Sequence, residues 1–364
     1  MAAVENSNSL AQTNQQQPPI EEPILSPSHL DGVAYLYGHP LLNSLSPPLH
    51  QTIYNALQLN WIQLPLSSVY GSSSTYPPPY TRSPPIDKFL PNIRANPKFV
   101  GSSVTMPWKV SIMEHLDDLT EEARQIGACN TIYIRQDPET GRKLLVGTNT
   151  DCIGVREALR QATPLSSNPD AFRGKPGLIF GGGGTARSAI YAMRKWIGCS
   201  RIYIVNRDAA EIEAILHEDR KRASSSLQQV PIIPIMTPAE VDQLDEYPPV
   251  IVSAIPNYPP KSADEIRARA VLERFLSSSS PPNEGRVFLE MCYHPLPWTQ
   301  IAELASGHGW NIVLGSEALI WQGIEQARLW TGRDIVSVPG LVPKIKDFVA
   351  GTIEAKAPAV KTNL

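Results

Sequence analysis

Two charged residues within mostly small and apolar segments, Lys109 and Asp151, are the first candidates for chemistry. Lys109 follows a proline in "GSSVTMPWKVSIM" (101–113), and Asp151 closes a small polar run in "GTNTDCIGV" (147–155). Each stands at the end of a predicted strand, where side chains of α/β proteins commonly line a ligand cleft. A lysine and a carboxylate held together there could pass a proton to or from a substrate hydroxyl. The residues alone leave two other interpretations open, a surface helix cap for Asp151 and a structural ion pair.

A glycine cluster, "FGGGGTARSA" (180–189), follows the predicted strand "KPGLIF" and opens a predicted helix. Glycines let the backbone come close to a pyrophosphate, and a helix N-terminus offers it free N–H groups and a positive dipole. This context predicts a dinucleotide site, and a tight turn without a ligand is the alternative. The candidate residues are Gly181, Gly182, Gly183, Gly184, Thr185 and Ala186.

The next predicted strand, "SRIYIVNR", ends at Asn206, Arg207 and Asp208, where the adenosine ribose is expected to bind. An acid at this position is typical of NAD sites, and an arginine accommodates the 2′-phosphate of NADP. The sequence offers both, but the acids Glu211 and Glu213 follow and a single arginine among acids is a poor phosphate clamp. The pattern therefore favours NAD slightly over NADP, and the arginine could instead stack on the adenine.

The arrangement of strands and helices predicts an α/β protein with two units. Between residues 155 and 315 strands alternate with helices, which predicts a parallel, doubly wound, Rossmann-like domain that binds NAD(P). Residues 30–154 form a second α/β unit, expected to bind the substrate. The last helices, within 316–356, have no strand partner of their own and are expected to pack back against it. Residues 1–29 are predicted to be a disordered tail.

Composition narrows the function classes. The chain has 364 residues and a formal net charge of −3, so nothing indicates a nucleic-acid partner, and no apolar run is long enough to span a membrane. The four cysteines show no metal or disulfide spacing, so no metal is expected. Proline is frequent, 35 residues, and gathers in the tail and in two predicted loop insertions, 67–85 and 277–285. We expect a cytoplasmic protein, a monomer or homodimer.

Eight segments together resemble one family, the shikimate and quinate dehydrogenases. In chain order from about residue 35 to 332 they are "YGHPLLNSLSPPLH", "VTMPWK", "IGACNT", "GTNTD", "GGGGTARSA", "NR", "YHPLPWT" and "WQGIEQARLWTG". The wording is most similar to stand-alone fungal quinate dehydrogenases. The resemblance implies oxidation of quinate to 3-dehydroquinate, or of shikimate to 3-dehydroshikimate, with hydride passing to NAD or NADP and no metal.

The resemblance also implies roles for individual residues. Lys109 would accept the proton of the hydroxyl being oxidised, with Asp151 orienting it or sharing the proton. The cyclitol carboxylate would be held by Ser44 and Ser46, with Tyr293 near it or at the substrate rim. Ring hydroxyls would be held by Thr105, Asn130 and Gln322. Ser253 and Gly315 would lie at the cofactor, Gly315 close to the nicotinamide.

Two departures from the family pattern keep other substrates in view. Asn43 stands where the family usually has histidine, and Ala318 replaces a usual methionine, leaving more room beside the nicotinamide. A dehydrogenase of a modified cyclitol such as an aminoshikimate is therefore one alternative. A non-catalytic quinate sensor is another, although a sensor would have little use for Lys109, Asp151 and a complete glycine loop together.

Overall fold

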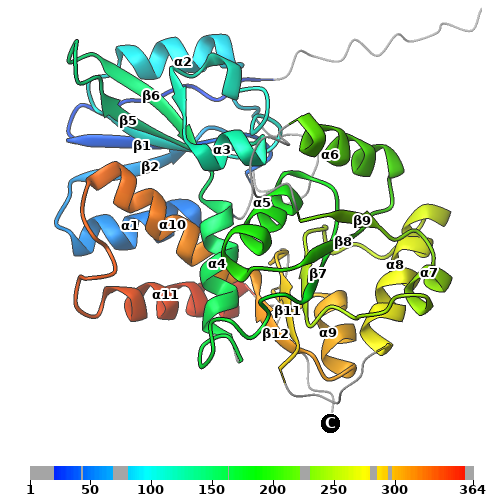
Figure 1. The fold of residues 1–364 in the computed structure, drawn as a ribbon. Coiled ribbons are helices and arrows are strands. Elements are labelled where there is room, and N and C mark those ends of the chain that lie inside the picture. Colours follow the sequence, from blue (N-terminus) through cyan, green and yellow to red (C-terminus); the bar gives the residue numbers. More distant parts are fainter. Residues whose placement is uncertain are drawn as a thin grey trace, which may run out of the picture.

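A computed structural model describes residues 20–41, 44–68, 81–162, 164–221, 230–278, 285–293 and 297–356. These residues form two six-stranded sheets, one built from β1–β6 and the other from β7–β12. Figure 1 shows the first sheet above and the second below, with α4 running between them. The predicted α/β class with a doubly wound second sheet is confirmed.

The first sheet is mixed. Its strand order is β2-β1-β3-β5-β6-β4; β5 runs antiparallel to both neighbours and the other pairs are parallel. The strands are β1 (Gly32–Tyr37), β2 (Trp61–Pro65), β3 (Phe99–Val104), β4 (Asp118–Leu119), β5 (Thr131–Gln136) and β6 (Lys143–Thr148). The helices along this segment are α1 (Ser46–Ala56), α2 (Ile86–Ala95), the 3₁₀ turn η1 (Met113–His115) and α3 (Glu121–Ile126).

The second sheet is entirely parallel, in the order β12-β11-β10-β7-β8-β9. Its strands are β7 (Pro176–Phe180), β8 (Arg201–Val205), β9 (Ile232–Pro234), β10 (Val250–Ser253), β11 (Val287–Glu290) and β12 (Asn311–Leu314). The helices are α4 (Asp151–Gln161), α5 (Gly184–Ala192) with the π turn η2 (Met193–Ile197), α6 (Ala209–Lys221), α7 (Pro238–Asp242), α8 (Ala263–Ser277) and α9 (Gln300–Gly307). Parallel neighbours need such crossovers.

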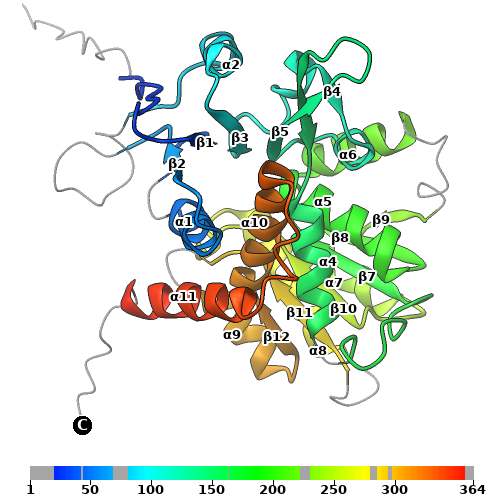
Figure 2. The ribbon, with the colours of Figure 1, turned by 90° about the vertical axis from the view of Figure 1, so that its left-hand side faces the viewer.

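The last two helices, α10 (Gly315–Thr331) and α11 (Leu341–Lys356), return to the first half of the chain, as predicted. Figure 2 shows α10 beside α4, with α1 and α11 next to it. The approach of α10 to α4 is close, because a Cβ atom added at Gly154 would collide with the backbone carbonyl of Ala318. Leu49, Ile324 and Ile345 from α1, α10 and α11 share one buried cluster.

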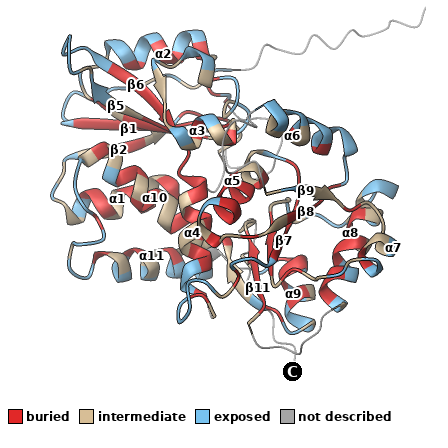
Figure 3. Ribbon diagram, viewed as in Figure 1, coloured by how far each residue is buried: buried red, intermediate tan, exposed pale blue. Residues whose placement is uncertain are grey.

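Buried residues fill both sheets and the helices between them (Figure 3). The second sheet has an apolar cluster on each face, because buried parallel strands are apolar on both sides. In β7, for example, Ile179 belongs to one cluster and Leu178 to the other. The two faces of this sheet are thus closed by helices, and the strand ends are left to carry polar side chains.

Some local expectations are wrong. Residues 20–29, assigned to a disordered tail, bond to the first half of the chain: Tyr35 Oη donates to the Leu25 carbonyl at 2.8 Å and the Glu22 amide to the Arg82 carbonyl at 2.8 Å. Between β3 and β4 the chain forms only the short η1 turn, and two elements, α2 and β12, were not anticipated from the sequence. Residues 1–19, 69–80 and 279–284 of the predicted tail and insertions lie outside the described residues.

Candidate active site

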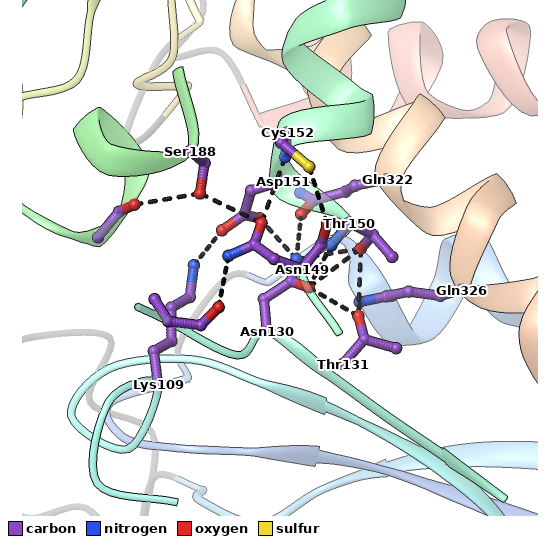
Figure 4. A network of polar contacts seen from close by, with 12 residues as sticks. Lys109, Asn130, Thr131, Asn149, Thr150, Asp151, Cys152, Ser188, Gln322 and Gln326 are labelled. Carbon is purple, nitrogen blue, oxygen red and sulfur yellow. Dashed lines mark hydrogen bonds and ion pairs between the residues drawn. The ribbon is translucent and has the colours of Figure 1, made fainter. Parts of the chain in front are cut away.

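Lys109 and Asp151 form an ion pair in the structure. Lys109 Nζ donates to Asp151 Oδ2 at 2.5 Å, with 20% and 8% of the two side-chain surfaces exposed. Figure 4 shows the lysine reaching from its loop towards the start of α4. The surface-cap interpretation of Asp151 is wrong: it is the first residue of α4, buried, and the residue before it, Thr150, is the N-cap.

Main-chain contacts fix both partners. Lys109 lies in the loop after β3, and its carbonyl accepts the Cys129 amide at 2.7 Å. The neighbouring Trp108 donates from Nε1 to Ser83 Oγ at 2.8 Å and stacks on Tyr37. Asp151 sits at a helix N-terminus, whose positive dipole stabilises a carboxylate. The pair is therefore held from two separate parts of the chain before any ligand binds.

Asn130 lies next to the pair and occupies the second carboxylate oxygen. Its Nδ2 donates to Asp151 Oδ1 at 2.7 Å and contacts Gln322 Oε1 at 3.2 Å. Its Oδ1 accepts the Thr150 amide at 2.6 Å, and because a backbone amide can only donate, this contact fixes the orientation of the side-chain amide. Asn130 is 3% exposed. Both carboxylate oxygens of Asp151 thus have donors.

The hydrogen bonds continue from Asn130 away from the lysine. Thr131 Oγ1 donates to Asn130 Oδ1 at 2.8 Å, and Gln326 Nε2 donates to Thr131 Oγ1 at 2.9 Å (Figure 4). Ser103 Oγ donates to Gln326 Oε1 at 2.9 Å, and Gln63 Nε2 donates to Ser103 Oγ at 2.9 Å. Ser46 Oγ ends the series by donating to Gln63 Oε1 at 2.9 Å. We call these residues, with Asp151, the polar chain.

The other predicted substrate residues come from nearby elements. Ser44 precedes α1 and its Oγ accepts the Ser46 amide at 3.3 Å. Thr105 directly follows β3, and its amide donates to the Tyr37 carbonyl at 2.8 Å. Tyr293 follows β11. Burial raises the pKa of its hydroxyl, and the Asp151 carboxylate adds to this effect, because Tyr293 lies near the ion pair.

The glycine loop connects β7 to α5. Gly181 has φ of +130°, a conformation that favours glycine, and a Cβ at Gly182 would lie 2.6 Å from Asn206 Nδ2. A Cβ at Gly183, by contrast, would meet no atom of the described residues within 4 Å. Gly183 is also the N-cap of α5 and supplies no side chain to cap the first amides of the helix.

This loop lies beside the ion pair. A Cβ built at Gly184 would be 3.8 Å from Lys109 Cδ. Ser188, one turn into α5, donates to Asn149 Oδ1 at 3.2 Å, and Asn149 in turn accepts the Cys152 amide at 3.3 Å (Figure 4). Thr185 and Ala186 lie in the first turn of α5. The predicted cofactor loop and the predicted proton-transfer pair are thus neighbours.

The end of β8 holds the residues expected to bind the adenosine. Asn206 donates from Nδ2 to Glu211 Oε2 at 2.6 Å. Asp208 Oδ1 accepts the Ala210 amide at 2.8 Å, at the start of α6. Arg207 donates to Glu265 Oε1 at 2.5 Å, and hydrogen bonds from the Lys261 and Ser262 amides and from Arg207 lower the pKa of Glu265 to about 2. Arg207, the cation that the sequence predicted for this site, is therefore paired with an acid.

The ends of β10 and β11 complete this side of the site. Ser253 is fully buried at the end of β10, and Glu290 at the end of β11 accepts from Thr299 Oγ1 at 2.9 Å and from the Cys292 amide at 3.0 Å. Burial raises the pKa of Glu290 to about 7. Gly315 begins α10, and a Cβ there would lie 2.7 Å from the Glu290 carbonyl oxygen. Its lack of a side chain is already required by packing.

Several residues of the polar chain were not anticipated from the sequence: Gln63, Ser103, Thr131 and Gln326. Gln326 had a signal, because it lies four residues after Gln322 on the same face of α10. Of the two departures, Asn43 lies outside the described residues. Ala318 is 1% exposed and packs in a core cluster with Cys152 and Val155.

None of the helices in the described part of the chain is long and apolar enough to cross a membrane. Among the same residues no group of three or more histidine, cysteine or acidic side chains is arranged to hold a metal ion. The four cysteines are all described and form no disulfide bond.

A family model and a similar curated protein point to the same family. Residues 36–132 match the family described as the shikimate dehydrogenase substrate binding domain. A quinate dehydrogenase of Emericella nidulans is 61% identical over 343 residues, covering 94% of this chain and all of that protein. The chain belongs to the shikimate and quinate dehydrogenase family. The resemblance inferred from the eight segments is confirmed.

Solved structures of this family share the fold. A shikimate 5-dehydrogenase from Listeria monocytogenes, in complex with shikimate and NAD, has a TM-score of 0.65 and 21% identity, and the match covers 92% of this chain and 100% of that one. A shikimate dehydrogenase in complex with NADP+ has a TM-score of 0.61 and 25% identity, covering 87% of this chain and 96% of that one. One of these two proteins is thus solved with NAD and the other with NADP+.

Proposed function

We propose that this chain is an NAD(P)-dependent dehydrogenase that oxidises quinate to 3-dehydroquinate, with shikimate as a second substrate oxidised to 3-dehydroshikimate. The single observation that carries the proposal is the adjacency of the Lys109–Asp151 pair to the glycine loop, with Gly184 beside Lys109. A dehydrogenase must remove a proton from a carbinol and a hydride from the same carbon. A proton acceptor next to a dinucleotide cradle meets this need.

The cofactor site fits a nicotinamide dinucleotide. The open space at Gly183 and the uncapped start of α5 suit a pyrophosphate, which accepts hydrogen bonds from backbone amides. We propose that residues 181–186 hold it, with Asn206, Arg207 and Asp208 at the adenosine end and Ser253 and Gly315 towards the nicotinamide. When bound, the cofactor accepts the hydride.

Lys109 moves the proton in the proposed reaction. Its Nζ passes a proton to the Asp151 carboxylate and, as the neutral amine, accepts the proton of the substrate hydroxyl while the carbonyl forms; Asp151 also orients the amine. Asn130 keeps the second carboxylate oxygen occupied, so the free rotation of Asp151 is restricted. Lys109, Asp151 and Asn130 thus position and deprotonate the substrate, and no metal is needed for this step.

The cyclitol would lie between the ion pair and the start of α1. We propose that Ser44 and Ser46 hold its carboxylate end, with Tyr293 near it. Thr105, Asn130 and Gln322 would hold ring hydroxyls, and a hydroxyl reaching Asn130 would compete with its present partners Asp151 and Gln322. On this assignment residues 30–154 and 316–356 bind substrate and residues 155–315 bind cofactor. The protein would act in the cytoplasm as a monomer or homodimer.

We further propose that NAD is preferred over NADP. Arg207, the residue that would meet a 2′-phosphate, is paired with Glu265, so this phosphate would meet an acid and a neutralised arginine. Asp208 lies beside it and keeps one carboxylate oxygen for a ribose hydroxyl, since its other oxygen accepts the Ala210 amide.

The test is the absorbance of reduced nicotinamide with purified protein and four combinations, quinate or shikimate with NAD or NADP. The proposal expects the fastest reduction with quinate and NAD. Preference for shikimate with NADP would keep the chemistry and overturn the substrate and cofactor choices. A folded protein that reduces neither cofactor with either substrate would contradict the proposed function.

A further inference from the structure

Gln63 is a buried polar residue in the middle of β2 whose side chain ends at Ser46. It is 2% exposed, and its Oε1 accepts from Ser46 Oγ at 2.9 Å while its Nε2 donates to Ser103 Oγ at 2.9 Å. The Nε2 atom also faces the Tyr35 carbonyl at 3.5 Å, and a carbonyl can only accept. With the amide reversed, Gln63 Oε1 would face the Tyr35 carbonyl oxygen, and neither could donate. The observed orientation is therefore favoured.

His50 removes the other possible acceptor for the Ser46 proton. Full burial lowers the pKa of His50 to about 4, so the ring is neutral and carries one proton. Its Nδ1 lies 2.9 Å from the Ser46 carbonyl oxygen, which can only accept, so the proton is on Nδ1. Nδ1 therefore cannot accept from Ser46 Oγ, 3.4 Å away. The hydroxyl proton of Ser46 is directed to Gln63.

The rest of the polar chain supports the same direction. Ser103 donates to Gln326, Gln326 to Thr131, Thr131 to Asn130, and Asn130 to the Asp151 carboxylate. Every group donates towards Asp151, and a negative charge at the accepting end favours this alignment. Ser46, at the opposite end, is left with an oxygen lone pair and no proton for a ligand.

Ser44 has the opposite character. Its Oγ accepts the amide proton of Ser46 at 3.3 Å, so within the described residues its own hydroxyl proton is available to an acceptor such as a carboxylate. The two serines therefore offer different chemistry at the same end of the site, a donor at Ser44 and an acceptor at Ser46. A carboxylate can use the first, whereas only a hydroxyl donor can use the second.

We propose that Gln63 is a positioning residue that sets substrate preference: by taking the Ser46 proton, it makes Ser46 an acceptor for a hydroxyl on the carboxylate-bearing carbon of the substrate. This inference rests on the proposed function and deepens it. Quinate has that hydroxyl on a tetrahedral carbon, whereas in shikimate the carbon belongs to a double bond. A site that hydrogen-bonds a substrate hydroxyl rejects the analogue that lacks it.

The first experiment compares kcat/KM for quinate and for shikimate in the wild type and in Gln63→Met, which keeps the side-chain length and removes the amide. Freed from Gln63, the Ser46 hydroxyl can donate to a carboxylate, which both substrates carry. The ratio of the two kcat/KM values should shift towards shikimate by about tenfold or more, through KM, with kcat for quinate little changed. An unchanged ratio would overturn the proposal.

Ser103→Ala is the matched control. It removes the partner of the Gln63 amino group but leaves the carbonyl facing Ser46, so it loosens the same buried cluster without changing the hydroxyl direction. Its melting temperature should fall while the substrate ratio stays at the wild-type value. An equal shift in both variants would mean that the ratio reports general loosening, and would also overturn the proposal.

Ser46→Ala gives an independent answer if Gln63→Met does not fold. Loss of an acceptor for the hydroxyl should raise KM for quinate at least about tenfold more than KM for shikimate. A serine that donates to the carboxylate would instead raise both KM values equally, which would contradict the proposal. If the wild type oxidises neither substrate, the proposed function fails; if it oxidises them and the ratios do not move, only the role of Gln63 fails.

Discussion

The two sides of the candidate site are built in different ways. On the substrate side, side chains from α1, β2, β3, β5, α4 and α10 form a continuous polar chain from Ser46 to Asp151, with Lys109 at its end. On the cofactor side, the loop between β7 and α5 presents mainly backbone, and its glycines leave open space at Gly183. Among the described residues, one side is a network of side chains and the other is mainly backbone, with space beside Gly183.

The difference follows from what each side would bind. A cyclitol carries several hydroxyls, each needing a partner of the right polarity, so fixed side-chain orientations discriminate between substrates. A pyrophosphate needs several amides at close range, so a backbone without side chains suits it. Substitutions of residues that contact the substrate, or that direct a contacting hydroxyl, should therefore change chemistry and selectivity, whereas side chains added to the glycine loop should act by filling space.

Apart from removal of Lys109 itself, the largest effect is expected for Asp151→Asn, which keeps the shape of the side chain and removes its charge. The Lys109 ammonium loses its counter-ion, and the amide cannot share a proton, so kcat for quinate should fall about a hundredfold or more. Steady-state kinetics with quinate and NAD measure this change in kcat. Asp170→Asn, which breaks the exposed ion pair with Arg173, is the control and should keep wild-type kcat.

Of the two buried carboxyl groups, Asp151 and Glu290, the second should make the stability of the protein depend on pH. Asp151 has a lysine partner, whereas burial raises the pKa of Glu290 from 4.5 to about 7. The folded state therefore keeps the Glu290 proton at pH values where the unfolded chain has lost it. The free energy of unfolding should fall between pH 4.5 and 7, by about 3 kcal/mol from this group.

Urea unfolding of the wild type and of Glu290→Gln at several pH values measures this contribution. The glutamine variant does not titrate, so the wild type should lose stability relative to it as pH rises from 4.5 to 7, and the difference should level off above pH 7. A constant difference across this range would show that Glu290 is not held protonated by its burial.

Filling the cofactor cradle should have a smaller effect that leaves folding intact. A side chain in Gly183→Leu meets no protein atom near its Cβ but enters the space proposed for the pyrophosphate. The dissociation constant for NAD should rise about tenfold, or roughly 1.4 kcal/mol, with the melting temperature unchanged. In Gly182→Ala the added Cβ would collide with Asn206, so that variant should lose stability. Equal NAD affinity in Gly183→Leu would exclude this surface as the cradle.

The smallest effect concerns cofactor choice. Glu265→Ala releases Arg207, which could then approach a 2′-phosphate. The pair is exposed, and exposed pairs contribute little, so kcat/KM for NADP relative to NAD should rise only about two- to fivefold. Serine at position 262 still caps α8, which limits the loss of stability. A ratio that does not change would remove the main support for the NAD preference.

Much of the fold and the reactive pair could be predicted because their signals are local. Lys109 and Asp151 each stand at a strand end, and strand ends of one sheet meet at one edge, so their contact was expected. β12 was missed because it is short and only partly buried, and α2 because Pro91 inside a helix normally argues against one.

The polar chain could not be predicted in the same way. Gln63 in β2 and Ser103, beside Ser102 in β3, are polar residues in otherwise apolar strands, a pattern that equally suits side chains facing water. Only tertiary packing brings β2, β3 and α10 together and gives each of these groups a partner. The direction of the hydrogen bonds, on which the inference about Gln63 depends, is a property of the folded assembly of elements.

The most direct test of the central claim is the rate of NAD reduction by quinate in wild type and in Lys109→Ala, followed by absorbance under single-turnover conditions. Loss of the proton acceptor should slow reduction about a thousandfold while NAD affinity stays unchanged. Lys88→Ala, which breaks the exposed pair with Glu21, should match the wild type. Reduction by Lys109→Ala at the wild-type rate would contradict the assignment of Lys109 as the proton acceptor.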